Sequence, residues 1–177
     1  MEKLRLSPRD AILEAAFDLL RLDASASLAN IAARAGVGRA TLHRQFAGRE
    51  DRIQAMALMA IDEMDAAAKR ATDNAKSYSE AFKNLFDELI PLADRHSFLA
   101  REPIEEDPEL AVEFRRQADE MAALVEAAKK DGLFDPLVPT HWIVQAFDHL
   151  LYAGWESVAA GEPTPKQAAE VASRTFF

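Results

Sequence analysis

The chain has 177 residues, a length typical of one medium-sized domain or of a small domain joined to a larger one. Ala accounts for 35 residues and Val, Ile and Thr together for only 19, so the composition favours helices over strands. The absence of cysteine excludes disulfides, thiol nucleophiles and Cys-ligated metal sites, and it is typical of a cytoplasmic protein. No secretory signal is visible and no apolar run is long enough to cross a bilayer, so we expect no membrane partner.

The net charge of −9 argues at first against a nucleic-acid partner, but the charge is unevenly distributed. Residues 1–52 hold nine Lys or Arg and seven Asp or Glu, whereas residues 53–177 hold 12 and 23. The stretch 34–49 carries Arg34, Arg39, Arg44 and Arg49 and no acidic residue. A small basic segment on an acidic body is typical of a protein that meets phosphates with one face only.

Apolar residues at helical spacing predict a first helix over residues 8–22, with Ser7 as its cap and Pro8 at its first position. Two short helices are predicted at about 27–34 and 38–44, separated by Gly36, which adopts the left-handed conformation without penalty. Longer helices are predicted over 48–73, 77–94, 108–130 and 139–160, and from about 165 to the last residue. Pro91 predicts a kink or an early end in the fifth helix. The chain is therefore expected to be all-α with about nine helices.

The two short helices and their glycine-containing turn form a helix-turn-helix pattern, in which the second helix lies in the DNA major groove. Gly38 and Ala40 are small enough to let that helix approach closely. Arg39 is expected to reach a base edge, most often guanine, and Thr41 to contact a thymine methyl or a phosphate. Arg34 has a simpler alternative interpretation as a solvated charge.

Further phosphate contacts are expected around this helix. Arg44 lies at its far end, and Ser27 and the free N–H groups of the preceding helix can bind another phosphate. Arg49 adds a basic contact at the start of the fourth helix.

The stretch 27–46, SLANIAARAGVGRATLHRQF, followed by Arg49 and Glu50, resembles the DNA-binding domain of the tetracycline-repressor (TetR) family. The resemblance extends over about residues 8–53. It implies a DNA-binding domain at residues 1–47 and a ligand-binding and dimerisation domain at residues 48–177. It also implies a homodimer that represses transcription and leaves its operator DNA when a small molecule binds the second domain.

Three positions depart from the family pattern. His43 stands where Tyr is usual, and its ring can still donate to a phosphate. Arg49 replaces a common Lys and keeps the charge. Arg52 replaces a usual Leu, so Ile53 is expected to carry more of the packing there.

Aromatic and Met side chains of the second domain are expected either to fill its core or to line a ligand cavity among the helices. The predicted cavity residues are Met59, Phe82, Phe86, Phe98, Phe114, Met121, Trp142 and Phe147. The histidines lack the spacing of a metal site, and no metal or cofactor is predicted. The last two helices present apolar faces that suit a dimer interface, at Leu150, Gly154, Val158, Val171 and Thr175.

The function that this pattern favours is a sequence-specific transcriptional regulator, a repressor released by a small-molecule effector. The alternative is a helical sensor with a vestigial DNA-binding part that acts by protein contact. An enzyme is not expected, because the sequence has no Ser/His/Asp grouping, phosphate-binding glycine loop or metal spacing.

Overall fold

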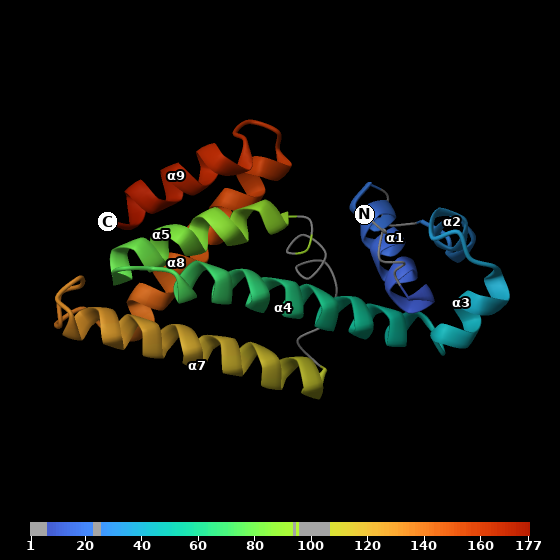
Figure 1. The fold of residues 1–177 in the computed structure, drawn as a ribbon, viewed down its shortest axis with the longest axis horizontal. Helices are drawn as coiled ribbons and strands as arrows, with labels where there is room; N and C mark the ends of the chain where they lie inside the picture. The colour runs from blue at the N-terminus through green and yellow to red at the C-terminus, as the bar shows by residue number, and fades with distance from the viewer. Residues whose placement is uncertain (1–6, 23–25, 94, 96–106) are drawn as a thin grey trace.

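A computed structural model describes residues 7–22, 26–93, 95 and 107–177. These residues form eight α-helices and one short 3-10 helix, with no strand among them (Figure 1). The elements are α1 (Pro8–Leu22), α2 (Leu28–Arg34), α3 (Arg39–Gln45), α4 (Arg49–Asp73), α5 (Tyr78–Leu89), η1 (Ile90–Leu92), α7 (Pro108–Lys130), α8 (Thr140–Ala159) and α9 (Pro165–Phe176).

The helix boundaries follow local capping signals. The hydroxyl of Ser27 accepts a hydrogen bond from the Asn30 N–H at 3.2 Å and caps α2. Gly36, with φ of +68°, turns the chain between α2 and α3. Pro91 has the effect expected of it, because α5 ends at Leu89 and the chain continues as η1. The all-α prediction is confirmed.

The first three helices and the first half of α4 share one hydrophobic core. We call residues 7–47 the head and the following residues the body. Ile12, Ile31 and Leu42, one from each head helix, are almost fully buried there. Met56 and Ile61 of α4 complete this core, together with Leu110 of α7.

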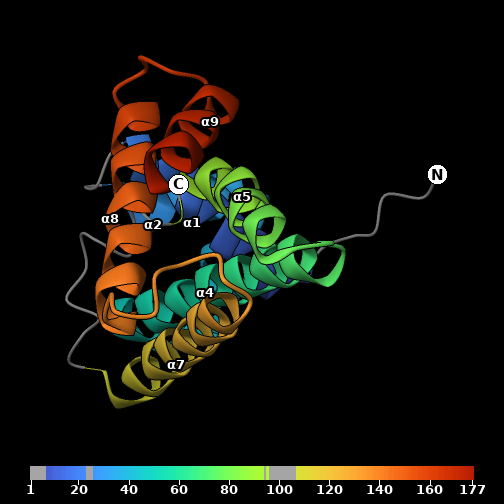
Figure 2. The ribbon, with the colours of Figure 1, turned by 90° about the vertical axis from the view of Figure 1, so that its left-hand side faces the viewer.

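The body has a second core, rich in phenylalanine. Phe82 and Phe86 of α5 pack against Phe147 of α8, with ring centroids 5.9 and 4.6 Å apart. Phe176 of α9 joins them, 5.4 Å from Phe82. Figure 2 shows α8 and α9 beside α5, with α4 and α7 forming the other side of the body.

The helix α4 belongs to both cores and joins the head to the body (Figure 1). Its first half contributes Met56 and Ile61 to the head core, and its second half contributes Ala67 and Ala71 to the body core. The division at residues 47 and 48 stays a prediction. Within the described residues, no helix is both long enough and apolar enough to cross a membrane.

Candidate nucleic-acid interface and ligand cavity

The helix α3 is anchored on one side and exposed on the other. Leu42 and Phe46 are buried in the head core, whereas Arg39, His43 and Arg44 are exposed. Because α3 has only seven residues, those two apolar anchors fix which face remains outside. The exposed face is cationic and carries no carboxylate, which suits the phosphates and base edges of DNA.

The predicted small residues leave this face open. Ala40 is exposed, and a Cβ atom at Gly38 would meet nothing within 4 Å. Thr41 is half-buried and Ser27 is exposed at the start of α2. A nucleic-acid backbone is therefore able to approach the N-terminal end of α3 closely.

Two of the arginines have different environments. Arg34 pairs with Asp18 of α1 at 2.6 Å, so its positive charge is balanced by a carboxylate within the head. Arg49 is exposed at the first position of α4. The carboxylate of Asp51 accepts a hydrogen bond from the Ala47 N–H at 2.8 Å, which fixes the turn between α3 and α4.

The position where Leu is usual in the family is occupied by a buried arginine. Arg52 is only 7% exposed, although it carries a charge. Ile53 is half-buried and packs against the head core, as expected from the sequence.

The body contains a partly open cavity of about 750 Å³ between α4, α5, α7 and α8. This volume lies in the range of small-molecule sites. Its apolar wall includes Met64, Leu85, Phe114, Met121 and Phe147.

Charged side chains also line the cavity. They are four carboxylates and two cations: Asp65, Asp73, Glu120 and Asp148, with Lys69 and Arg116. Lys69 pairs with Asp73 at 2.9 Å.

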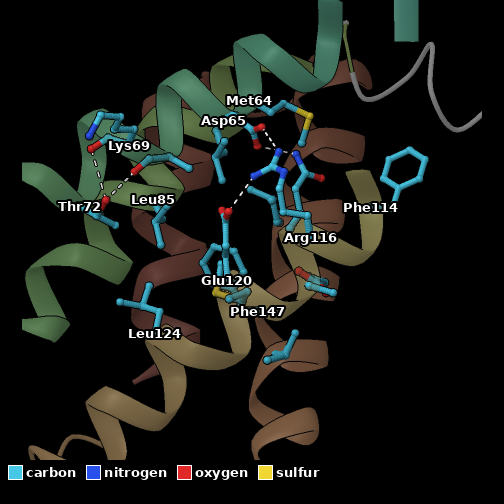
Figure 3. Close-up of a pocket in the computed structure, with 18 of the residues that line it drawn as sticks. Met64, Asp65, Lys69, Thr72, Leu85, Phe114, Arg116, Glu120, Leu124 and Phe147 are labelled. Carbon is cyan, nitrogen blue, oxygen red and sulfur yellow. Dashed lines mark hydrogen bonds and ion pairs between the residues drawn. The ribbon is translucent and has the colours of Figure 1, made fainter. Parts of the chain in front are cut away.

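Arg116 of α7 pairs with three carboxylates, and Figure 3 shows it between two of them, Asp65 and Glu120. It bonds Glu113 and Glu120 at 2.8 Å each, and it reaches across to Asp65 of α4. Gln117 donates to the other oxygen of Asp65 at 2.7 Å. The hydrogen bonds with Glu113, Glu120 and Asp65 raise the pKa of the Arg116 guanidinium above its ordinary value.

Asp148 is the carboxylate of the cavity that forms no ion pair within the described part of the chain. Desolvation by the surrounding protein raises the pKa of its carboxyl, and the neighbouring His149 lowers it by less. The cavity therefore has one carboxylate without an ion pair, on the exposed residue Asp148, in addition to its aromatic and thioether side chains.

Only some of the predicted cavity residues line the cavity. Phe114, Met121 and Phe147 line the cavity. Phe82 and Phe86 are fully buried in the aromatic core, and Met59 packs against the head core. Trp142 is 64% exposed on α8. Phe98 lies outside the described residues.

The residues predicted for a dimer interface also differ in environment. Val171 and Thr175 are exposed on α9, whereas Leu150 and Val158 are half-buried against the body core. Gly154 is buried against Ile90 of η1 within the same chain.

Sequence reasoning missed the charged members of the cavity. The i, i+3 and i, i+4 spacing of Glu113, Arg116 and Glu120 predicts ion pairs along α7, but it carries no sign of Asp65 on α4. In the part of the chain that the structure describes, no group of three or more His, Asp or Glu is arranged to hold a metal ion.

An exposed cationic helix-turn-helix, joined through one long helix to a body with a cavity, defines a DNA-binding transcriptional regulator. The family described as "Bacterial regulatory proteins, tetR family" matches residues 12–56. The HTH-type transcriptional repressor LfrR of Mycolicibacterium smegmatis is 36% identical over 156 residues, which is 88% of this chain and 81% of LfrR. The chain belongs to the TetR family of transcriptional regulators and is not an enzyme.

Solved structures agree with this assignment. The chain is similar to LfrR from Mycobacterium smegmatis in complex with proflavine, with a TM-score of 0.81 and 30% identity over 96% of this chain and 94% of LfrR. The ketosteroid regulator KstR2 of Mycobacterium tuberculosis shares the fold, with a TM-score of 0.74 and 17% identity over 97% of this chain and 92% of KstR2.

Proposed function

We propose that the protein is a homodimeric repressor that binds operator DNA through α3 and leaves it when a small molecule enters the body cavity. The observation that carries this proposal is the continuity of α4. One helix supports the recognition surface at its first residues and lines the cavity through Met64 and Asp65 further along. A ligand that displaces α4 changes the position of the head, and with it the affinity for DNA.

The proposal of a homodimer is supported by exposed apolar residues on α8 and α9. Trp142 and Val171 are each 64% exposed, and Tyr152 is also exposed. Large apolar side chains left exposed on two helices that pack together are typical of a protein interface. Two heads in such a dimer would read half-sites one DNA turn apart, about 34–36 Å, or a multiple of it.

The effector that fits the cavity best is a planar aromatic cation. The half-buried Phe114 offers a ring at the cavity wall, and Asp148 offers a carboxylate without a paired cation in the described chain. The similar regulator LfrR has been solved with proflavine, a planar acridine cation. Stacking and charge together favour this ligand class over neutral or anionic compounds.

The test is a fluorescence-anisotropy titration of the full-length protein against the DNA upstream of its own gene, at about 150 mM salt, with a scrambled duplex as control. Specific binding about 10³-fold tighter than to the control, weakened by proflavine, is the expected result. Genome-wide selection of bound sequences replaces the upstream DNA if both duplexes bind equally. A protein that selects no sequence would favour the alternative, a sensor that acts by protein contact.

A further inference from the structure

A buried arginine joins the head to the body. Arg95 follows η1, and its side chain is only 10% exposed. Its guanidinium donates to Glu14 of α1 at 3.0 and 3.1 Å and to Glu63 of α4 at 2.6 and 3.1 Å. Its central carbon also lies 4.0 Å from the ring centroid of Phe17 in α1. One side chain therefore contacts both the head and the body.

The charge of Arg95 requires both of its carboxylate partners. Burial lowers the pKa of the guanidinium, but the hydrogen bonds and charges of Glu63 and Glu14 raise it by more, so the net shift is upward. A buried cation that loses one of its partners is unfavourable, because part of its charge is then uncompensated in the protein interior. Arg95, Glu14 and Glu63 are therefore more stable together than when either carboxylate has moved away.

The contacts with the head depend on its orientation. Glu14 and Phe17 are three residues apart in α1 and lie on the same face of that helix. A rotation of the head relative to α4 would remove the ion pair and the ring contact from Arg95 together. The stabilisation that Arg95 gains from Glu14 and Phe17 therefore depends on the orientation of the head.

The contacts with the body come from elements that line the cavity. Glu63 immediately precedes Met64 and Asp65, which line it. Leu89, at the end of α5, lines it as well, and its carbonyl accepts a hydrogen bond from the Trp155 indole N–H at 2.9 Å. The segment that leads to Arg95 is thus anchored to α8 at the wall of the cavity.

We propose that Arg95 is a positioning residue, which fixes the orientation of the head through Glu14 and Phe17 and transmits the state of the cavity to the DNA-binding surface. The transmission rests on the proposed release of DNA by an effector, whereas the fixed orientation does not. A substitution that removes only the ion pair between Arg95 and Glu14 is the sharpest test.

Glu14→Gln is that substitution, because it keeps the shape of the side chain and leaves the Arg95–Glu63 pair in place. Glu88→Gln is the matched control, since Glu88 pairs with Arg70 of α4 at 2.9 Å within the body. Arg95→Met is a second variant, which removes both pairs. Circular dichroism and thermal melting establish that each variant is folded.

The first measurement is the orientation of the head in the full-length protein. The chain has no cysteine, so Ala33→Cys in α2 and Asp87→Cys in α5, both exposed, allow two spin labels to be placed specifically. Labelled chains are diluted in unlabelled protein. We expect a narrow distance distribution in the parent and in Glu88→Gln, and a broader or shifted one in Glu14→Gln. An unchanged distribution in Glu14→Gln and in Arg95→Met would overturn the proposal.

The second measurement is the ratio of the DNA dissociation constants with and without saturating proflavine. We expect Glu14→Gln to reduce this ratio at least threefold toward unity, with Glu88→Gln unchanged. If Glu14→Gln broadens the distance distribution but leaves the ratio of dissociation constants unchanged, Arg95 does not transmit the state of the cavity to the DNA-binding surface. If proflavine does not weaken DNA binding by the parent protein, the proposed effector is wrong, and the distance measurement alone decides whether Arg95 positions the head.

Discussion

Gly154 of α8 and Ile90 of η1 approach so closely that a Cβ atom at position 154 would lie 2.6 Å from Cδ1 of Ile90. Both residues are buried, and Ile90 is fully enclosed. The close approach that this glycine permits is therefore made within the chain. It sets the distance between α8 and the end of α5, next to the Trp155 hydrogen bond to Leu89.

Gly154→Ala is expected to destabilise the fold by about 1–3 kcal/mol, because overpacking of the core outweighs the higher helix propensity of alanine. The measurement is chemical denaturation. Ile90→Val removes the Cδ1 atom, so the double variant should be more stable than the sum of the two single effects. Strict additivity would contradict the steric explanation.

Arg39→Ala is expected to reduce operator affinity by about 1–3 kcal/mol and to relax specificity, since Arg39 is exposed on the recognition face. Arg49→Ala should weaken binding to all sequences alike, as the loss of a phosphate contact does. Anisotropy titrations against operator and scrambled DNA measure both. Equal losses on the two duplexes for Arg39→Ala would show that it contacts only the backbone.

Binding of a cation to the cavity should depend on pH through Asp148. Desolvation raises the pKa of its carboxyl, so protonation begins at a higher pH than for an ordinary aspartate. The ionised form attracts the cation, and affinity should therefore fall as the pH drops through this raised pKa. The probe is N-methylacridinium, whose own charge does not change with pH. Asp148→Asn should bind it more weakly and lose that part of the pH dependence; unaltered affinity in this variant would contradict the role.

Arg116→Met is expected to increase the affinity for a cationic ligand by about two- to fivefold, the size of a partly exposed ion pair. The substitution keeps an apolar stem and leaves Asp65 and Glu120 without their shared cation. Arg115→Met, at an exposed neighbouring position on α7, is the control. Titration with proflavine and with an uncharged anthracene separates charge from packing. An equal gain for both ligands would indicate a larger cavity instead.

The sequence predicted the helices well because their signals are local. Ser27, Gly36 and Pro91 each act within one turn of the chain, and the structure places helix ends beside them. The head was predictable for the same reason. Its short helices, glycines and basic residues lie within about 50 consecutive positions.

The cavity and the Arg95 contacts depend on residues far apart in the chain. Glu14 and Arg95 are separated by 81 positions, and no local pattern joins them. Periodicity indicates that Phe82 and Phe147 both face inward, but it does not indicate which of them borders an empty space. Trp142 was misleading in the same way, because its size suggested an interior position and the structure leaves it exposed.

The core beneath the recognition helix is completed from outside the head, by Met56, Ala57, Ala60 and Ile61 of α4 and Leu110 of α7. A fragment that ended at residue 47 would expose to water the side of this core that α4 and α7 cover, and so small a fragment has few other sources of stability. DNA binding therefore depends on residues of α4 and α7 as well as on the head. A substitution in the body that loosens α4 would also reduce the fraction of molecules in which the recognition helix α3 is folded, even if the substituted residue contacts neither DNA nor ligand.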